Sequence, residues 1–251
     1  MSVDKIVNYR MKHGTKIQWT HFPGYKGETW NPITGCSHIS VGCDNCYAER
    51  ISKRFGWPWG KPIFHPERLD IPSRWKKPRA IFVCSMSDLF HDNVPDDFIW
   101  SVLQQAVDNP RHLFLILTKR PQKMSYFFNR FGTLHNIWTG VTVEHPDYLD
   151  RIDILRQMTA AHKFISFEPL LARISEVDLT GIDWVICGGE SGPGARSMHF
   201  DWPRNLRDQC QLANVPFFMK QMSGRSAYQR HNIPVDLMIK EFPEVSQCNQ
   251  Q

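Results

Sequence analysis

The sequence predicts an α/β protein built as a partial (β/α) TIM-like barrel of about six or seven parallel strands. From residue 80 onward, short apolar runs alternate with amphipathic stretches, and the strand-like runs recur roughly every 25 to 30 residues, the spacing of βαβ units. Polar and charged side chains follow the C-terminal end of these apolar runs, where a barrel gathers its functional groups. An open doubly wound sheet would place the same side chains along a crevice instead.

The elements follow one another regularly along the chain. We expect the first strand and its turn in "ETWNPITG", and the first helix in "CYAERISKRFG". Later strands are expected, as apolar runs, at residues 80–85, 112–118, 136–143, 163–169, 183–189 and 215–221. Later helices are expected, as amphipathic stretches, at residues 94–109, 120–132, 145–158 and 201–214.

Residues at the helix ends support these assignments. Pro95 suits a first helical turn, and Asp96 and Asp97 favour the positive N-terminal end of the same helix. Gly132 is typical of a helix stop. These residues therefore predict where helices begin and end, in addition to which segments are helical.

The chain is expected to form a single domain over residues 1–251. Residues 56–79 are rich in Pro and Trp without a clean period, and we interpret them as an insertion between the first helix and the second strand. Residues 243–251 have the composition of a frayed tail.

Composition indicates an ordinary globular protein with a mildly basic balance. The formal charge of +5 is compatible with a nucleic-acid partner but does not require one. No apolar run approaches the roughly 18 residues that a membrane helix needs, so no membrane partner is expected. The N-terminal residues lack the apolar core of a signal peptide, which favours a cytoplasmic location.

Three of the seven cysteines form a cluster with chemical meaning. Cys36, Cys43 and Cys46 have the spacing C-x6-C-x2-C in the first βα loop, on the face where the strand-end groups converge. Cytosolic thiols stay reduced, so clustered cysteines there indicate metal binding or catalysis. A Cys3His zinc site that includes His38 is one possibility. An iron–sulfur cluster held by three thiolates, with one iron left open, is the other.

The strand-end side chains are the remaining candidates for the site. They are Ser85, Ser87, Asp88, Thr118, Lys119, Arg120, Glu144, His145, Glu168, Glu190, Lys220 and Gln221. The Gly-rich stretch "GGESGPGARSMH" could let its backbone approach a ligand closely. It lacks the pattern of a nucleotide-binding P-loop, which argues against a kinase or an ATPase.

The cysteine triplet in the first βα loop resembles that of the radical S-adenosylmethionine enzymes. In that superfamily a [4Fe–4S] cluster uses its open iron to chelate the amino and carboxylate groups of the cofactor. Two features depart from the usual pattern: the first gap has six residues instead of three, and Asn45 stands where an aromatic residue is common.

A second resemblance covers nearly the whole chain. The segments "KIQWT", "TWNPITGCSHISVGCDNCYAER", "LTKRP", "FEPLL" and "WVICGGESGPGARSMHFDWPRNLRDQC" are similar to those of phage- and prophage-associated three-Cys-motif proteins. That family is regarded as radical S-adenosylmethionine-like, and its reaction is uncharacterised. The resemblance therefore implies the fold and the cofactors but gives no substrate.

Specific roles follow from the resemblance. Cys36, Cys43 and Cys46 would ligate the cluster. The superfamily's Gly-Gly-Glu motif, which binds the amino group of S-adenosylmethionine, normally follows the second strand. Here Gly188, Gly189 and Glu190 follow a late strand instead. The remaining candidates for the cofactor are Ser85 and Asp88 for its amino group, Lys119 or Arg120 for its carboxylate, and Glu144 or Glu168 for its ribose.

The implied chemistry is reductive cleavage of S-adenosylmethionine to methionine and a 5′-deoxyadenosyl radical, which then abstracts a hydrogen atom from a substrate. A reductant protein of the flavodoxin or ferredoxin type is implied as a partner. A nucleic-acid or nucleotide substrate is suggested by the basic residues Lys76, Lys77 and Arg79 and by the Trp-rich segment before them. A solvent-exposed turn would explain the same residues equally well.

Two other functions stay open at this point. A non-catalytic nucleic-acid-binding protein would use Cys36, His38, Cys43 and Cys46 to hold zinc. A degenerate barrel would keep a cluster only as structure or as a redox sensor. The strand-end carboxylates argue against the nucleic-acid-binding protein, because they would repel phosphate.

Overall fold

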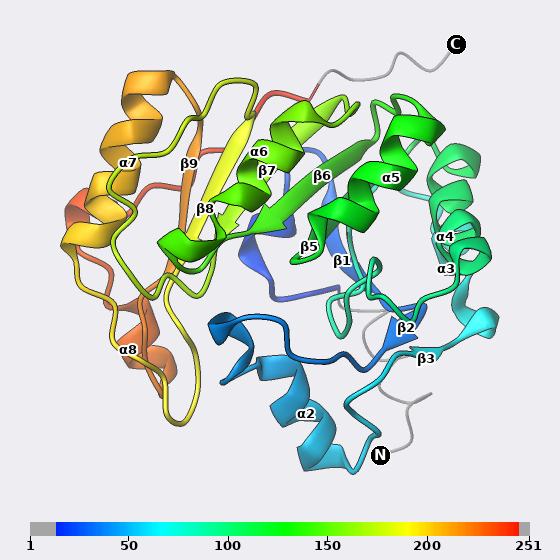
Figure 1. Cartoon of the computed structure of the whole chain (residues 1–251), viewed down its shortest axis with the longest axis horizontal. Coiled ribbons are helices and arrows are strands. Elements are labelled where there is room, and N and C mark those ends of the chain that lie inside the picture. The colour runs from blue at the N-terminus through cyan, green and yellow to red at the C-terminus, as the bar shows by residue number, and fades with distance from the viewer. Residues whose placement is uncertain (1–13, 246–251) are drawn as a thin grey trace.

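The computed structural model describes residues 14–245, and its main element is a seven-stranded parallel sheet (Figure 1). The strands neighbour one another in the order β1-β4-β5-β6-β7-β8-β9. Their bounds are β1 Lys26–Trp30, β4 Arg79–Val83, β5 Leu113–Thr118, β6 Ile137–Thr142, β7 His162–Phe167, β8 Trp184–Gly188 and β9 Phe217–Gln221. The expected barrel of six or seven parallel strands is thereby confirmed.

The strand order shows that the sheet is a partial barrel and not a doubly wound sheet. Spatial order follows chain order throughout, and every neighbouring pair is parallel, so the sheet has no point at which the winding reverses. Over residues 14–245 no pairing joins β1 to β9, and the sheet therefore remains an open half-barrel. The carboxyl ends of all seven strands meet at one edge.

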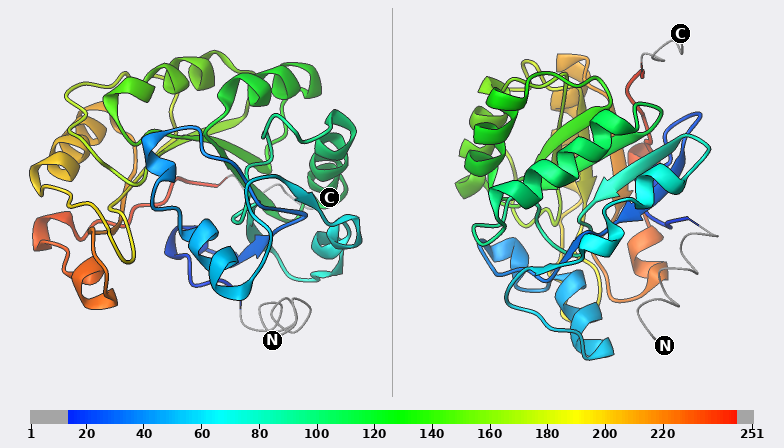
Figure 2. Two further views of the ribbon diagram at one scale, coloured as in Figure 1. Left: turned by 60° about the horizontal axis from the view of Figure 1, so that its bottom comes forward. Right: turned by 90° about the vertical axis from the view of Figure 1, so that its right-hand side faces the viewer.

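Helices cover the outer face of this sheet (Figure 2). The crossover helices are α4 Asp96–Asp108, α5 Pro121–Phe131, α6 Asp150–Gln157 and α7 Asp201–Ala213. Helix α2, at Tyr47–Phe55, instead follows the cysteine-bearing loop, and the short α8, at Ala227–His231, follows β9. The expected helices are all present.

The first expected strand is divided into two elements. β1 ends at Trp30, and the residues Ile33–Thr34 form β2, which pairs antiparallel with β3 at Ile63–Phe64. Pro32 supplies no N–H for a ladder, and the Asn31 side chain accepts from the backbone N–H of Met86 at 2.9 Å. The chain therefore leaves the sheet after Trp30.

The Pro- and Trp-rich segment 56–79 contains β3, a 3₁₀ turn at Pro66–Arg68 and the short helix α3 at Ile71–Arg74. Trp75, at its end, is buried with 6% exposure. The indole of Trp30 donates to the Arg68 carbonyl at 2.7 Å, which fastens the segment to β1. The segment interpreted as an insertion therefore contains short regular elements and is attached to the sheet.

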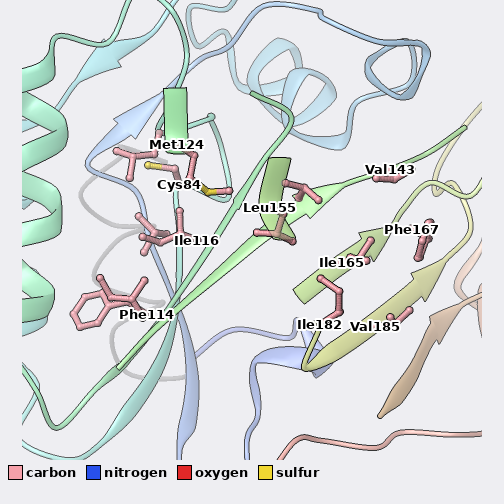
Figure 3. Close-up of a cluster of buried hydrophobic side chains, with 14 of the residues drawn as sticks. Cys84, Phe114, Ile116, Met124, Val143, Leu155, Ile165, Phe167, Ile182 and Val185 are labelled. Carbon is pink, nitrogen blue, oxygen red and sulfur yellow. The ribbon is translucent and has the colours of Figure 1, made fainter. Parts of the chain in front are cut away.

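Two cores lie on opposite faces of the sheet. The larger one fills the space between the strands and the outer helices, with Ile116, Val143, Ile165 and Leu155 among its members (Figure 3). The buried strands are apolar on both faces, as expected where both sides of a parallel sheet are covered. This arrangement explains why the strands read as continuous apolar runs.

The core on the inner face of the sheet is mainly aromatic, and it fills the inside of the half-barrel. Its members are Trp19, Phe22, Ala80, Phe82, Leu113, Leu115, Trp138, Phe164, Trp184, Ile186 and Phe218. Trp19 and Phe82 have ring centroids 4.8 Å apart. Aromatic residues fill this wide space with few side chains, so the Trp-rich composition is used largely for packing.

Residues 1–13 and 246–251 lie outside the described residues, and so do Cys248 and most of the expected tail at 243–251. Within residues 14–245 no helix has both the length and the apolar character needed to cross a membrane.

His112 is expected to make stability depend on pH. Its buried ring accepts from the backbone N–H of Arg79 at 3.1 Å and donates to the Pro72 carbonyl at 3.0 Å, and burial lowers its pKa to about 4. The unfolded histidine titrates near 6.5, so the stabilisation is complete above that pH and is lost as pH falls toward 4. The loss corresponds to about 3 kcal/mol.

Urea unfolding at pH 7 and pH 4.5 measures this effect. In a His112→Asn variant the difference in unfolding free energy between the two pH values should shrink, because the titrating ring is gone. Exposed His231 provides the matched control, and His231→Asn should retain the full difference. An equal pH dependence in the parent and His112→Asn proteins would contradict the assignment.

Candidate functional site

A cavity of about 380 Å³ lies at the carboxyl edge of the sheet, above the aromatic inner core. Loops that follow β4, β5, β7 and β8 line it, together with the last two residues of β9 and the cysteine-bearing loop before α2. Trp19, Phe82 and Leu117 form part of its apolar wall. Its volume suits one small organic molecule.

All three clustered cysteines line this cavity. Cys43 ends a 3₁₀ turn that begins at Val41, and Cys46 precedes the first residue of α2. The backbone N–H of Cys46 donates to the Cys43 carbonyl at 3.2 Å, which makes the tight turn that the x2 spacing predicts. The longer first gap lets the chain bring Cys36 to the same cavity.

The thiols suit an iron–sulfur cluster in kind and location. In their present rotamers, Cys36 Sγ lies 3.5 Å from the Ser37 carbonyl and Cys43 Sγ lies 3.8 Å from Ser40 Oγ. In residues 14–245 no three His, Cys, Asp or Glu side chains converge closely enough to hold a metal ion without turning. Burial, helped by Asp88, raises the pKa of Cys36 to about 11, and Arg120 opposes this shift.

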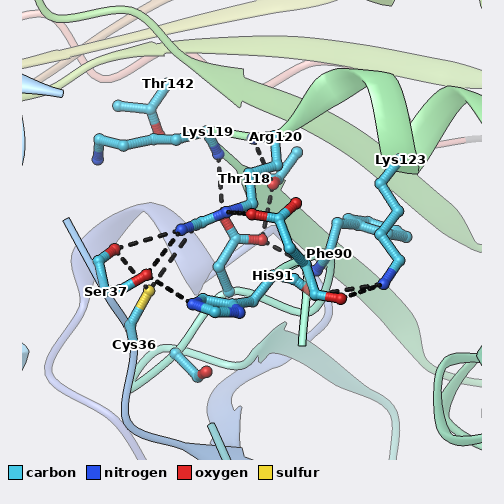
Figure 4. A network of polar contacts seen from close by, with 12 residues as sticks. Cys36, Ser37, Phe90, His91, Thr118, Lys119, Arg120, Lys123 and Thr142 are labelled. Atoms are coloured by element: carbon cyan, nitrogen blue, oxygen red, sulfur yellow. Dashed lines mark hydrogen bonds and ion pairs between the residues drawn. The ribbon is translucent and has the colours of Figure 1, made fainter. Parts of the chain in front are cut away.

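Asp88 and Arg120 form an ion pair that joins two strand-end loops. Figure 4 shows that the Arg120 side chain reaches toward Cys36 and Ser37. Asp88 Oδ1 accepts from Thr118 Oγ1 at 2.7 Å, while Oδ2 accepts from the Lys119 N–H at 3.1 Å and from Arg120 Nη1 at 3.2 Å. Arg120 Nη1 also lies 3.9 Å from Cys36 Sγ. Both Asp88 and Arg120 are buried, so each charge depends on the other.

Ser37 and His91 extend this network toward the cysteine loop. Arg120 Nη2 donates to the Ser37 carbonyl at 3.3 Å, and Ser37 Oγ lies 2.7 Å from His91 Nε2. The Asn93 N–H donates to His91 Nδ1 at 3.1 Å, so in the neutral ring Nε2 carries the proton. Burial and the Arg120 charge lower the pKa of His91.

The structure gathers most of the predicted site residues in the cavity wall. Those that line it are Ser85, Ser87, Asp88, Thr118, Lys119, Arg120, Glu168, Gly189, Glu190, Lys220 and Gln221. Glu144, His145 and Gly188 do not line it. The convergence expected from strand ends is therefore present at the carboxyl ends of β4, β5, β7, β8 and β9.

Glu144 holds the cysteine loop from below. It is fully buried, accepts from Arg151 Nη1 at 2.9 Å and also accepts the Ser40 hydroxyl. A Cβ at Gly42 would lie 2.7 Å from Glu144 Cγ, so the loop needs glycine at that point. The position of Glu144 suits support of the loop rather than contact with a ribose in the cavity.

Two other predicted carboxylates are neutralised by cations. Glu190 Oε1 accepts from Arg196 Nη2 at 2.6 Å, and its Oε2 accepts from Asn45 Nδ2 at 2.9 Å. Burial alone would raise the pKa of Glu190, but these hydrogen bonds hold it below its usual value. Glu168 Oε1 accepts from Lys220 Nζ at 2.5 Å.

Lys119 differs from the other cavity cations. Arg120 is held by Asp88 and Lys220 by Glu168, whereas the Lys119 amino group has no acceptor within the described part of the chain. An unpaired ammonium group in a cavity wall is suited to an anionic ligand group.

His38 is turned toward α2. Its Nε2 lies 2.7 Å from Glu49 Oε2, and its side chain is 49% exposed. The Cys3His zinc arrangement would require His38 to leave this contact with Glu49 and point inward. The geometry therefore gives that alternative no support.

Residues 14–241 match the protein family described as "Protein of unknown function (DUF5131)". The chain belongs to the DUF5131 family. No curated protein and no solved structure matches it. The cluster, the cofactor and the phage association remain predictions from the resemblance.

Sequence reasoning missed several residues that shape the site of this DUF5131 protein. Asn45 bonds to Glu190, and Arg50 on α2 donates to the carbonyls of Ser191 and Pro193. Arg50 lies four residues after Cys46, on the helix whose N-cap is Cys46. This spacing is the sequence signal that could have indicated its role. Their partners are about 140 residues away, and no local pattern reports such pairs.

The glycines of the Gly-rich stretch in this DUF5131 chain also have a role that depends on distant residues. Gly192 has φ +99°, and a Cβ there would lie 2.5 Å from Arg50 Nη2. A Cβ at Gly189 would lie 2.2 Å from the backbone N of Ser223. These glycines therefore allow close packing of the loop against α2 and against the residues just after β9.

Proposed function

We propose that this DUF5131 protein is a radical S-adenosylmethionine enzyme with a [4Fe–4S] cluster held by Cys36, Cys43 and Cys46. The observation that supports it best is the single cavity lined by all three thiols and by the polar ends of the strands. The cluster, once reduced, would supply the electron that cleaves the cofactor. A cytoplasmic setting, which keeps the thiols reduced, and an electron donor of the flavodoxin or ferredoxin type belong to the proposal.

In this proposal Lys119 binds the carboxylate of S-adenosylmethionine. Its amino group is unpaired in the cavity wall, whereas Arg120 is already engaged by Asp88 and Cys36. Arg120 then acts indirectly, because it fixes the Ser37 carbonyl next to the first ligand. Ser85 lies in the same wall and offers its hydroxyl to the amino group.

The apolar side of the cavity holds the adenosyl part and excludes water. Trp19, Phe82 and Leu117 provide this surface, and Trp19 and Phe82 also belong to the aromatic inner core. Ser166 and Glu168 also line the cavity and can hydrogen-bond to hydroxyl groups of a ligand. Exclusion of water protects a reactive species from side reactions.

Anaerobic reconstitution with iron and sulfide tests the proposal. Electron paramagnetic resonance of the reduced protein should show a [4Fe–4S] signal that changes when S-adenosylmethionine is added, and 5′-deoxyadenosine should accumulate. A cluster signal that does not change when S-adenosylmethionine is added would contradict the enzyme function. A protein that holds one zinc tightly and forms no cluster would instead support the Cys3His alternative.

A further inference from the structure

Three segments surround the mouth of the cavity and lie against one another. We call them the rim: residues 47–61, residues 191–200 and residues 222–233. Arg50 of the first segment donates to Pro193 of the second at 3.3 Å, and the Gly192 N–H donates to the Gly224 carbonyl of the third at 3.0 Å. Helices α2 and α8 accordingly lie at the same end of the sheet (Figure 1).

The rim has a strong excess of positive over negative side chains. Its segments contain seven Lys and Arg residues and a single acidic residue, Glu49, whereas the whole chain has a formal charge of +5. Lys53, Arg54, Lys61 and Arg225 are exposed. Such a patch favours an anionic polymer over a neutral ligand.

Aromatic side chains alternate with these cations on the surface. Phe55 and Trp57 stack with ring centroids 5.2 Å apart, and the Arg54 guanidinium lies 5.7 Å above Phe55. Phe55 is 46% exposed, and Tyr228 on α8 is 83% exposed. Exposed rings beside cations are what unpaired bases and their phosphates require.

The cavity carboxylates do not oppose such a partner. Glu168 and Glu190 are each paired with a cation, so they present little net negative charge to a phosphate. The cavity, at about 380 Å³, has room for about one small molecule. If S-adenosylmethionine occupies it, the reacting part of a substrate must enter from the mouth while the rest lies on the rim.

We propose that the rim binds single-stranded nucleic acid and presents one nucleotide to the cavity. The choice of substrate rests on the proposed function, but binding to the rim does not. Lys53, Arg54 and Lys61 contact phosphates, and Phe55 and Tyr228 stack on bases. A duplex keeps its bases stacked on each other and therefore cannot use these rings.

The basic segment singled out in the sequence does not belong to this surface. Trp75 is buried, and Arg79 pairs with Glu28 at 3.3 Å. Lys76 and Lys77 are exposed but precede β4, at the amino ends of the strands. They thus provide a matched control, with two neighbouring cations on the opposite end of the barrel.

Fluorescence anisotropy with a labelled single-stranded oligonucleotide tests the proposal on the full chain without any cluster. The Lys53→Gln/Arg54→Gln variant should bind about tenfold more weakly than the parent protein and show a smaller salt dependence, because phosphate contacts are lost. The Lys76→Gln/Lys77→Gln variant should bind like the parent. Tyr228→Ala should weaken binding at least about fivefold, as expected for a lost base stack.

Circular dichroism establishes that the variants are folded. Three results would overturn the proposal: no binding by the parent at low salt, equal losses in the two double variants, or equal affinity for a duplex of the same length. Oligonucleotide binding by a chain that never forms a cluster would overturn the proposed function alone. Cluster formation without oligonucleotide binding would overturn the rim assignment alone.

Discussion

Replacement of Asp88 by alanine is expected to lower the free energy of unfolding by about 3 to 5 kcal/mol. Its carboxylate accepts from the N–H groups of Phe90 and Lys119, from the Thr118 hydroxyl and from Arg120, with distances of 2.7 to 3.2 Å. Removing it leaves the buried Arg120 charge without its main partner, which costs more than the lost hydrogen bonds. Urea unfolding followed by circular dichroism measures the change.

Asp92 is a matched control on the same guanidinium. Its carboxylate lies 3.7 Å from Arg120 Nε but is 79% exposed, so Asp92→Ala should cost less than about 1 kcal/mol. A paired variant, Asp88→Leu with Arg120→Met, should be more stable than Asp88→Ala alone, because no buried charge remains. Equal losses in Asp88→Ala and Asp92→Ala would contradict the buried ion pair.

The fold was largely predictable from the sequence because every central strand of the sheet is buried on both faces. Such strands are continuous apolar runs, and the helices between them are long enough to show their period. The prediction failed at the first strand, where Pro32 and the Asn31 side chain end β1 early. It also missed the short elements of residues 56–79, whose order comes from contacts such as that of Trp30 with Arg68.

The candidate site was predictable in location but not in its pairings. A side chain just after a parallel strand must lie near the carboxyl edge, so Asp88, Lys119 and Glu190 were found without tertiary information. Which of these groups are free depends on distant residues. Glu190 is neutralised by a neighbouring loop and Glu144 is covered by the cysteine loop, and neither fact has a local signature.

Loss of any one of the three clustered thiols is expected to abolish stoichiometric iron and sulfide binding. Cys43→Ser is the clearest variant, because Cys43 is only partly buried and its Sγ makes a long contact of 3.8 Å with Ser40 Oγ. Its unfolding free energy should therefore change by less than about 1 kcal/mol. Iron and sulfide analysis of the reconstituted protein, with circular dichroism for the fold, measures both effects.

Cys84 provides the discriminating comparison, because it is a fourth thiol that lines the same cavity. It is buried, burial raises its pKa, and it belongs to the outer core, as Met124 does (Figure 3). A thiol in apolar surroundings is poorly suited to ligation, so Cys84→Ala should retain the cluster. If it loses the iron instead, four thiolates close the site, and the open coordination position that the proposed enzyme needs does not exist.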